Sequence, residues 1–451
     1  MSLPGLSSGA ESEGQTHLID LAAGSEWRVE VPATSQLNVT LLDGTAEVFG
    51  TELAVGAQYS FVGQNTAIYT WYGCKLQYSS TLHSSISTSS ATFSEYTSDE
   101  TPMTVYANLH FALETLRNES KPPSVLVLGP PYSGKTSICK ILASYANKTG
   151  RFPMVVNLDP AMGVYSCPGG LSAAPVSDIL DVEDSTGGWG SSQVNGPALL
   201  HPKSPLVYYY GLETPQKNSK YFKHVASRLA LGVQARLSAD KKVRESGIII
   251  DTPGTGMSDS AVSSVIADFK VTVVVVVGNE RLYSDLAKRY KEKTNLTVLK
   301  VPKSGGCVDL DPPAVRATQS RSMRDYFYGT IKQTLDPYSV TVDYSAVTVY
   351  RVLEESELDS SALPAGEQAD SQHSAQHLVK LETSAILQNC VMAMLNASPA
   401  DSVDLLVQSE VLGYVHVITA DDDRRKLVIR MPVPGRLPQR PFVIGDYRYH
   451  E

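Results

Sequence analysis

The stretch that decides the fold of the central part of the chain is Ser124-Val-Leu-Val-Leu-Gly-Pro-Pro-Tyr-Ser-Gly-Lys-Thr-Ser-Ile-Cys-Lys-Ile-Leu. It contains the pattern GxxxxGK[ST] from Gly129 to Thr136. A short apolar run before the pattern predicts a strand, and apolar residues at helical spacing after it predict a helix. Strand, glycine-rich turn and helix in this order are the context that a phosphate-binding P-loop requires.

Each residue type in this loop has a physical role in phosphate binding. Gly129 permits the sharp exit from the strand, and Gly134 lets the backbone N–H groups at the helix N-terminus approach anionic oxygens. The Lys135 ammonium would neutralise the β- and γ-phosphates of ATP, and the Thr136 hydroxyl would hold Mg²⁺. A chance glycine-rich turn is the alternative, and the complete pattern in its context favours nucleotide binding. The predicted loop contacts are Gly129, Pro131, Tyr132, Ser133, Gly134, Lys135, Thr136 and Ser137.

Two aspartates follow predicted strands at their carboxyl ends, where ligands bind in parallel sheets. Asp159 could accept a proton from an attacking hydroxyl or hold the metal through water, and Asp251 is a candidate for the Walker-B acid. A turn or N-cap role is the structural alternative for each.

The nucleotide could in principle be ATP or GTP. Asp251-Thr-Pro-Gly resembles the DxxG switch of GTPases, and Asn157-Leu-Asp-Pro-Ala recurs in one GTPase group. The sequence has no [NT]KxD motif to read guanine, and the Gly-Pro-Asn insertion of that group is missing after Ala161. ATP is therefore favoured over GTP.

Around the P-loop, short apolar runs alternate with helical segments between about residues 122 and 330. This alternation predicts an α/β domain with a parallel sheet buried on both faces. The expected strands are Val125–Leu128, Met154–Leu158, Ile248–Ile250, Val271–Val277 and Leu296–Val301. Asp181–Pro197 is rich in Gly, Ser and Asp and predicts a surface loop, and a helix is expected over Val105–Arg117.

Before this domain, short strands and turns from Trp27 to about Tyr78 predict an all-β unit. Asp43-Gly44 predicts a hairpin turn between Leu37–Leu42 and Ala46–Phe49. The Ser/Thr-rich segment 79–98 is expected to be a flexible linker.

After residue 330, strand-like runs such as Val347–Val352 and Lys426–Arg430 predict a β-rich domain, and the acidic segment Glu354–His377 predicts a disordered excursion. The predicted organisation is a flexible tail (1–16), an N-terminal β domain (17–101), a central P-loop domain (102–330) and a C-terminal β-rich α+β domain (331–451).

Composition limits the function classes. The 451 residues contain 38 Lys and Arg against 47 Asp and Glu, a net charge of −9, which argues against non-specific coating of duplex nucleic acid. The longest purely apolar run, Val273–Val277, is far below the roughly 20 residues that a membrane-spanning helix needs, so no membrane segment is expected. The N-terminus does not predict a secretory signal. No two of the five cysteines lie within four residues of each other, so neither zinc knuckles nor disulfides are implied and a reducing, intracellular setting is expected.

Seven further motifs accompany the P-loop in a fixed order: Phe49-Gly-Thr-Glu-Leu-Ala-Val, Asn157-Leu-Asp-Pro, Cys167-Pro-Gly-Gly, Pro175-Val-Ser-Asp-Ile-Leu, Pro302-Lys-Ser-Gly-Gly, Tyr326-Phe-Tyr-Gly and Val433-Pro-Gly-Arg-Leu-Pro. With them the chain resembles, over nearly its whole length, the family of polynucleotide 5′-hydroxyl kinases and the related mRNA cleavage and polyadenylation factor, and the fungal branch most closely. The resemblance implies three domains, with the N-terminal β domain contacting adenine. Glu26, which precedes the first expected strand, matches an acidic adenine-contacting position, and Asn65 falls where a relative has lysine. Both could equally be exposed loop residues.

The resemblance also separates binding from catalysis. Active members transfer the ATP γ-phosphate to an RNA 5′-hydroxyl, and Asp159 matches their base. Their following glutamine is replaced here by Met162, whose thioether cannot orient a phosphate in the same way. Their RNA-clasping tryptophan falls at Thr255.

The lid arginines of active members fall at Leu310 and Val315, although Arg316 and Arg321 stand nearby, so that a shifted lid stays open. Loss of the cationic lid groups could cost about 10³-fold or more in rate.

The expectation is therefore an ATP-binding nuclear subunit of a pre-mRNA 3′-end cleavage and polyadenylation factor with little or no catalysis. Bound ATP would brace the N-terminal and central domains. The implied partners are a scaffold subunit that also binds the RNA polymerase II tail, and other cleavage factor subunits; contact with RNA would be indirect. An active RNA 5′-hydroxyl kinase is the alternative, because the fold hosts both.

Overall fold

The structure, a computed structural model, describes residues 16–82, 93–191, 193, 204–330, 332–360 and 377–451. Its internal contacts divide the chain into two compact units. The first runs to Thr101 and includes Val182–Ser185, and the second contains Pro102–Asp181 and Thr186–Glu451. The second unit thus contains both the central and the C-terminal regions, and the division into three domains stays a prediction. The expected tail falls outside the described residues, except for Thr16.

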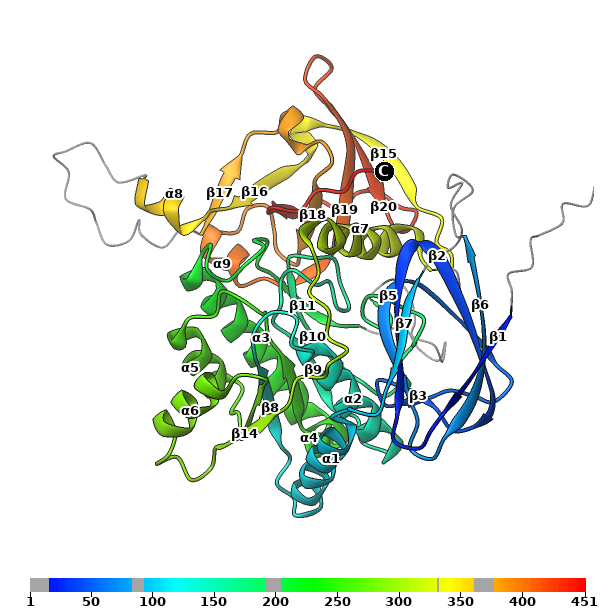
Figure 1. Cartoon of the computed structure of the whole chain (residues 1–451). Helices are drawn as coiled ribbons and strands as arrows, with labels where there is room; N and C mark the ends of the chain where they lie inside the picture. Colours follow the sequence, from blue (N-terminus) through cyan, green and yellow to red (C-terminus); the bar gives the residue numbers. More distant parts are fainter. Residues whose placement is uncertain (1–15, 83–92, 192, 194–203, 331, 361–376) are drawn as a thin grey trace, which may run out of the picture. The chain divides into compact units, whose positions relative to one another are not determined.

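The first unit is built on one seven-stranded sheet of order β1-β6-β2-β5-β3-β4, with β7 also paired to β2 (Figure 1). Its strands are β1 (His17–Leu21), β2 (Glu26–Gly44), β3 (Glu47–Val48), β4 (Thr51–Glu52), β5 (Gln58–Tyr69), β6 (Cys74–Leu82) and β7 (Ser94–Ser98). Apolar residues alternate along β2, so that Leu37, Val39 and Leu41 are buried together with Trp27. The predicted all-β unit is confirmed.

The predicted hairpin at Asp43-Gly44 is wrong. Strand β2 continues to Gly44 and pairs there with β6, whereas β3 pairs with β4 and β5. Gly44 has a φ of +82°, and a Cβ on it would lie 2.3 Å from the carbonyl oxygen of Gly73. The glycine is therefore required by a close approach between two strand ends and not by a two-residue turn.

The Ser/Thr-rich linker is also corrected at both of its ends. Strand β6 extends to Leu82, and β7 pairs antiparallel with the start of β2. Threonine and tyrosine suit a pleated, half-buried surface, which explains why this composition forms strands here. The Trp27 indole anchors β7 by donating to Glu95 at 2.6 Å. The middle of the linker, residues 83–92, lies outside the described residues.

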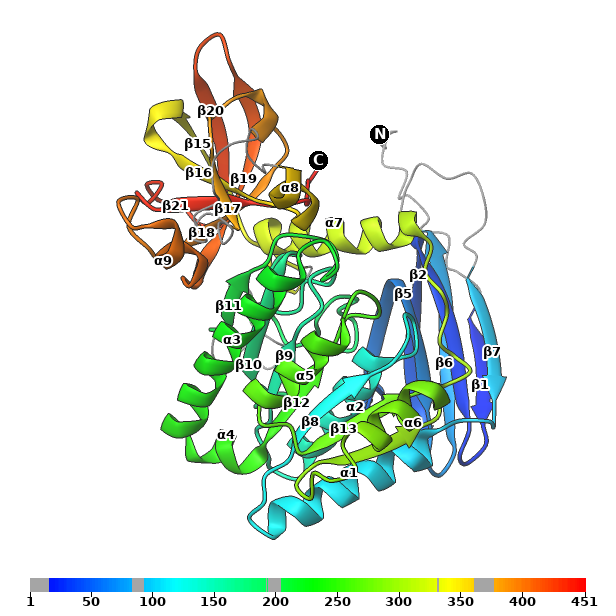
Figure 2. The same cartoon turned by 90° about the vertical axis from the view of Figure 1, so that its left-hand side faces the viewer.

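The central sheet has the order β11-β10-β9-β12-β8-β13-β14 (Figure 2). Its strands are β8 (Ser124–Leu128), β9 (Met154–Asn157), β10 (Gly170–Pro175), β11 (Leu206–Tyr209), β12 (Ile248–Asp251), β13 (Val273–Val277) and β14 (Thr297–Val301). From β9 to β14 the strands are parallel, and β8, β9, β12 and β13 are buried throughout, as predicted. Strands β10 and β11 extend this sheet antiparallel, which the apolar runs did not predict.

Helices cover both faces of this sheet. They are α1 (Met103–Asn118), α2 (Lys135–Lys148), α3 (Ser219–Ala239), α4 (Lys241–Ser246), α5 (Asp259–Asp268) and α6 (Glu280–Arg289). Helix α7 (Pro312–Tyr328) follows β14 and contacts the loop after β9 instead. Because parallel crossovers are right-handed, α2 lies on one face, and α5, reached in the opposite direction along the sheet, lies on the other. Helix α1 packs on α2, and α3 packs on α5.

The predicted surface loop Asp181–Pro197 is corrected in its described part. Trp189 is 2% exposed and stacks on Tyr165 with a ring-centroid distance of 6.2 Å. Val182 is 6% exposed and packs in the core of the first unit. The segment has little regular structure, but two of its apolar side chains, Val182 and Trp189, are buried.

The C-terminal region is a seven-stranded sheet of order β15-β20-β19-β18-β21-β16-β17, antiparallel except between β16 and β21. Its elements are β15 (Tyr338–Asp343), β16 (Thr348–Val352), α8 (Glu355–Ser360), β17 (Leu378–Leu381), β18 (Val391–Leu395), α9 (Val403–Val407), β19 (Val411–Asp421), β20 (Lys426–Met431) and β21 (Pro441–Ile444), with 3₁₀ turns at Tyr344–Ala346 and Ala385–Leu387. The predicted excursion therefore begins as helix α8, and residues 361–376 lie outside the described part.

Within the described ranges, no helix is long and apolar enough to cross a bilayer.

Candidate functional site

The P-loop joins β8 to α2. Gly134 is the N-cap residue of α2, with a φ of +84°, and a Cβ on it would lie 2.9 Å from the Cys307 sulfur. A Cβ on Gly129 would lie 2.9 Å from the carbonyl oxygen of Val277 on β13. Any side chain at either position would therefore push the loop away from its neighbours, which explains both glycines of the motif.

The next two residues carry the charge and the hydroxyl of the site. Lys135 is 6% exposed, and its ammonium donates to the carbonyl oxygen of Pro130 at 2.9 Å. Thr136 is an exposed residue, and its hydroxyl donates to a carboxylate oxygen of Asp251 at 2.6 Å. The strand order explains this pair, because β12 lies directly beside β8 and brings Asp251 to the loop.

The remaining loop residues surround this pair. Ser133 is buried and donates to the Pro130 carbonyl at 2.9 Å. Tyr132 has a φ of +52° and is 38% exposed. Pro131 is exposed, and a Cβ on Gly254 would lie 2.6 Å from its Cα, so the loop after β12 packs closely against the P-loop. Ser137 is half-buried in the first turn of α2.

Burial and mutual charge govern the titration of this cluster. Burial, and then the neighbouring Asp251 charge, raise the pKa of Asp159 from 3.8 to about 6, although the Ala161 N–H and Lys135 oppose the shift. Burial also raises the pKa of Asp251 and lowers that of Lys135, while the attraction between these two opposes both shifts. One ammonium beside two carboxylates leaves a net negative charge when both are ionised, so a polyanion would need a further cation to bind here.

The raised pKa of Asp159 predicts a pH-dependent gain of stability in an Asp159→Asn variant. Between about pH 4 and 6 the native state binds more protons than the unfolded state, so wild-type stability falls as the pH rises through this window. In protein stripped of nucleotide, the variant should therefore be more stable than wild type by about 1–3 kcal/mol at pH 7, and equal to it near pH 4. Chemical denaturation at both pH values measures this. A variant less stable than wild type at pH 7 would contradict the assigned direction.

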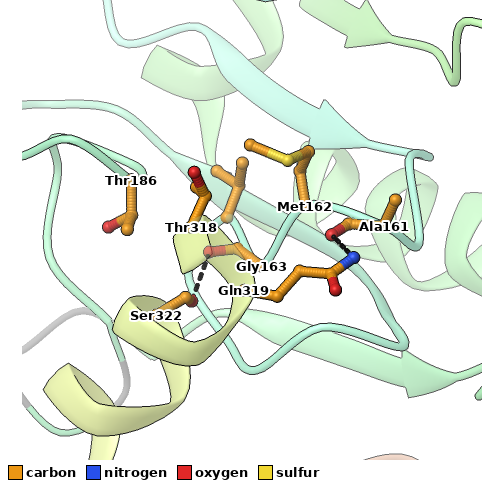
Figure 3. Close-up of a pocket in the computed structure, with 8 residues that line it drawn as sticks. Ala161, Met162, Gly163, Thr186, Thr318, Gln319 and Ser322 are labelled. Carbon is orange, nitrogen blue, oxygen red and sulfur yellow. Dashed lines mark hydrogen bonds between the residues drawn. The ribbon is translucent and has the colours of Figure 1, made fainter. Parts of the chain in front are cut away.

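Asp159 lies in a loop whose carbonyl groups accept hydrogen bonds from the loop's own Asn157 and from side chains of α7. The Asn157 amide donates to the carbonyl oxygens of Asp159 at 3.1 Å and Met162 at 2.9 Å. From α7, Gln319 donates to Ala161 at 3.1 Å and Ser322 to Gly163 at 3.4 Å (Figure 3). We call residues 157–163 the Asp159 loop. Sequence reasoning missed Gln319 as a neighbour of this loop, although its place in a helix after the Lys-Ser-Gly-Gly motif was a signal.

Helix α7 is in the place that the resemblance assigned to the lid. Residues three or four apart share a helix face, so Val315 lies on the same face as Gln319, which contacts the Asp159 loop. An apolar side chain is therefore found on the face that would need a cation. Arg316, three residues before Gln319, is exposed at the edge of the same face, and Arg321 lies on the opposite side of α7 from Gln319. A lid in which Arg316 supplies the charge stays an alternative. Leu310, the other predicted lid position, precedes the helix.

The two predicted adenine contacts lie in the first unit. Glu26 begins β2 and is 3% exposed, so it is neither in a loop nor before the first strand. Its carboxylate accepts from the Arg28 guanidinium at 2.5 Å and from the Thr101 hydroxyl at 2.9 Å. Asn65 is exposed on β5, where it lines a pocket of about 460 Å³ with Glu30 and Phe93. Their adenine contacts stay a prediction.

The donor set beside the P-loop suits a hard cation. Among the residues that the structure describes, no group of three or more His, Cys, Asp or Glu side chains could hold a metal by itself. Mg²⁺ in nucleotide sites, however, needs only one or two protein oxygens besides phosphates and water. The Thr136 hydroxyl and the Asp251 carboxylate, 2.6 Å apart, are such a pair.

Three family models match the chain and together span most of it. Residues 20–120 match the N-terminal β-sandwich domain of polyadenylation factor, and residues 129–329 match the P-loop of mRNA cleavage and polyadenylation factor CLP1. Residues 335–451 match pre-mRNA cleavage complex II protein Clp1. The matches follow the order of the β unit, the P-loop region and the C-terminal sheet.

Full-length relatives and solved structures agree with these models. The chain is 41% identical to mRNA cleavage and polyadenylation factor CLP1 of Yarrowia lipolytica, covering 100% of both chains. It is 38% identical to the corresponding factor of Botryotinia fuckeliana, covering 99% of this chain and 98% of the relative. A solved Clp1p–Pcf11p interface, described with the structural basis for ATP loss in a point mutant, matches with a TM-score of 0.85 at 30% identity, covering 97% of this chain and 100% of the other. A wild-type Clp1p–Pcf11p complex matches with a TM-score of 0.84 at 31% identity and the same coverage.

Proposed function

The chain belongs to the Clp1 family of mRNA cleavage and polyadenylation factors, and from this premise we propose that it holds ATP as a structural ligand with little or no phosphoryl transfer. The observation that carries the proposal is a contrast within one site. The binding groups Lys135, Thr136 and Asp251 are assembled, whereas Met162 and Val315 are found where transfer would need polar or cationic groups.

Binding is supported by the geometry of the P-loop. When ATP binds, the N-terminus of α2 and the Lys135 ammonium would contact its phosphates, and Lys135 would exchange the Pro130 carbonyl for a stronger, charged partner. Thr136 and Asp251 would hold Mg²⁺, which supplies positive charge to the phosphate oxygens. A ligand that binds only the folded state stabilises that state in proportion to its concentration.

Weak or absent transfer is supported by what surrounds the γ-phosphate position. The Met162 thioether is a poor hydrogen-bonding group, and Val315 offers no charge on the loop-facing side of α7. Thr255, which lies in the loop after β12, is too small to stack on a base. Without cations over the moving phosphoryl group, the transition-state charge is left unstabilised.

An active RNA 5′-hydroxyl kinase remains the second candidate because of one observation. The pKa of Asp159 is raised to about 6, close to the neutral pH at which a general base works best. The same aspartate accepts a hydrogen bond from the Ala161 N–H at 3.0 Å, which fixes its orientation at the end of β9. Arg316, on the flank of α7, would then have to supply the lid charge.

The proposed setting is a nuclear pre-mRNA 3′-end cleavage factor. Both solved neighbours are complexes of Clp1p with Pcf11p, which supports a counterpart of Pcf11p as the partner of this chain. We propose that this counterpart is a scaffold subunit that also binds the RNA polymerase II tail, and that other cleavage factor subunits join through it. The net charge of −9 is consistent with meeting RNA mainly through these partners.

Affinity purification of the tagged full chain from nuclear extract tests this function in one experiment. We expect 3′-end processing subunits among the proteins recovered, and intact ATP rather than ADP released from the chain on denaturation. Mass spectrometry identifies the proteins, and chromatography identifies the nucleotide. Recovery of tRNA-splicing endonuclease without 3′-end subunits, or of a nucleotide-free chain, would contradict the proposal.

A further inference from the structure

The motif Cys167-Pro-Gly-Gly takes no part in phosphate chemistry, yet it lies directly behind the Asp159 loop. The Gly169 N–H donates to the carbonyl oxygen of Pro160 at 2.8 Å, and the Gly169 carbonyl accepts from the N–H groups of Tyr210 and Gly211, both at 2.9 Å. The motif therefore connects the Asp159 loop with the end of β11.

The ring of Tyr447, near the C-terminus, packs against Gly169. This glycine has a φ of +92°, and a Cβ there would lie 2.9 Å from the Tyr209 ring and 3.1 Å from the Tyr447 ring. Only glycine lets these two rings close over the backbone. The position of Tyr447 is thus set by the central domain as well as by its own segment.

Tyr447 follows β21, and its side chain reaches the Asp159 loop. Its hydroxyl donates to the Pro160 carbonyl oxygen at 2.7 Å. The same oxygen also accepts the hydrogen bond from the Gly169 N–H. The side chain is 5% exposed, and burial raises the pKa of its hydroxyl well above the usual value, so it stays a protonated donor at neutral pH. Pro160 is the residue after Asp159, so this bond fixes the chain immediately beyond that carboxylate.

The bond completes an unusual set. Each of the five consecutive carbonyl groups from residue 159 to residue 163 accepts a hydrogen bond from a side chain. The donors are Asn157 (twice), Tyr447, Gln319 and Ser322. Asn157 is local, Gln319 and Ser322 come from α7, and Tyr447 is the sole donor of this set that comes from beyond residue 330.

We infer that Tyr447 is a positioning residue of the nucleotide site, through which the C-terminal segment holds the Asp159 loop and slows the loss of bound nucleotide. The inference rests on the proposed retention of ATP and adds the element that controls it. Since coupling between two sites is reciprocal, a bound nucleotide should in turn hold the C-terminal segment more firmly.

The test compares Tyr447→Phe with Tyr449→Phe in the full chain. The first removes one hydroxyl from the Pro160 carbonyl and keeps the ring on Gly169. The second removes a hydroxyl from an equally buried tyrosine of the same segment, whose backbone bonds to Asn389 and His416 instead. A fluorescent ATP analogue reports the dissociation rate, and hydrogen exchange reports residues 157–164 and 445–449.

We expect Tyr447→Phe to speed dissociation about two- to tenfold, the range for one lost neutral hydrogen bond, with faster exchange in the Asp159 loop. Tyr449→Phe should leave both unchanged. In wild type, added ATP should slow exchange in residues 445–449. Gly169→Ala, which displaces the Tyr447 ring, should act in the same direction and more strongly.

The outcomes separate the two proposals. If wild type retains nucleotide and Tyr447→Phe releases it at the wild-type rate, the positioning role is wrong and the structural-ligand function stands. If both tyrosine variants speed release equally, Tyr447 has only a general packing role and the inference fails. If wild type binds no nucleotide, the proposed function fails and the inference fails with it.

Discussion

A Lys135→Ala variant should be purified without the nucleotide that wild type carries. The variant removes the buried ammonium, the closest cation to the phosphates in this site, and leaves Asp159 and Asp251 as uncompensated carboxylates beside them. Loss of a charged hydrogen bond together with this repulsion should weaken ATP binding on the order of 100-fold or more. At ATP concentrations near 100 times the wild-type Kd, bound ATP adds about 2.7 kcal/mol to the stability of wild type, and the variant would lose at least about 2.3 kcal/mol of this.

The measurement is the nucleotide content of each protein together with its melting temperature across an ATP titration. Lys148→Ala is the matched control, because it removes a lysine from the same helix about 20 Å away, at its C-terminal end. Wild type and control should contain ATP and melt at a temperature that rises with ATP, whereas the melting temperature of Lys135→Ala should rise much less over the same concentrations. Equal nucleotide content in wild type and Lys135→Ala would show that the P-loop does not hold the ligand.

The central fold could be predicted from the sequence because local and global signals agree there. The runs that form β8, β9, β12 and β13 are short, apolar and separated by helical spacing, and burial on both faces leaves them no other environment. Strand β10 escaped prediction because Gly170–Pro175 is small and weakly apolar, and its place in the sheet depends on tertiary pairing with β9.

The first unit shows where local turn chemistry misleads. Asp43-Gly44 has the composition of a hairpin turn, but its glycine serves a close approach to Gly73, and both residues still pair with β6 at the end of β2. The Ser/Thr-rich segment has the composition of a linker, but its ends complete a sheet that needs an extra strand beside β2. Local composition limits the backbone conformations that a segment can adopt. Strand pairing with residues far along the chain determines which of them the segment adopts.

The candidate site divides in the same way. A motif predicts the glycines, Lys135 and Thr136, and the position of Asp251 at the end of a predicted strand predicts its role. The structure brings Thr136 and Asp251 into contact. Tyr447 carries no such signal, and Gln319 carries only its place in a helix after the Lys-Ser-Gly-Gly motif, because a tyrosine or a glutamine becomes part of a site only through the fold that delivers it. Sequence therefore predicts the groups that face the ligand more readily than the groups that hold them in place.

The chain, loaded with labelled ATP and Mg²⁺ and given RNA with a 5′-hydroxyl end, should yield no labelled RNA above background. The expected rate is at least about 10³-fold below that of an active polynucleotide kinase, because the loop-facing side of α7 carries Val315 in place of a cation. Added active kinase must label the same RNA in the same mixture, which shows that the substrate is competent. An Asp159→Asn variant should give the same background as wild type.

Substitutions that supply the missing groups test whether their absence is the cause of the missing transfer. Met162→Gln together with Val315→Arg places an amide in the Asp159 loop and a guanidinium on the face of α7 that already contacts this loop through Gln319. If the absent groups are the cause, this variant should gain labelling that Asp159→Asn then abolishes. Val315→Lys, which lacks the bidentate fork, should gain less. Asp159-dependent labelling by the unmodified chain would instead establish the kinase, with Arg316 as its lid cation and ATP as its substrate.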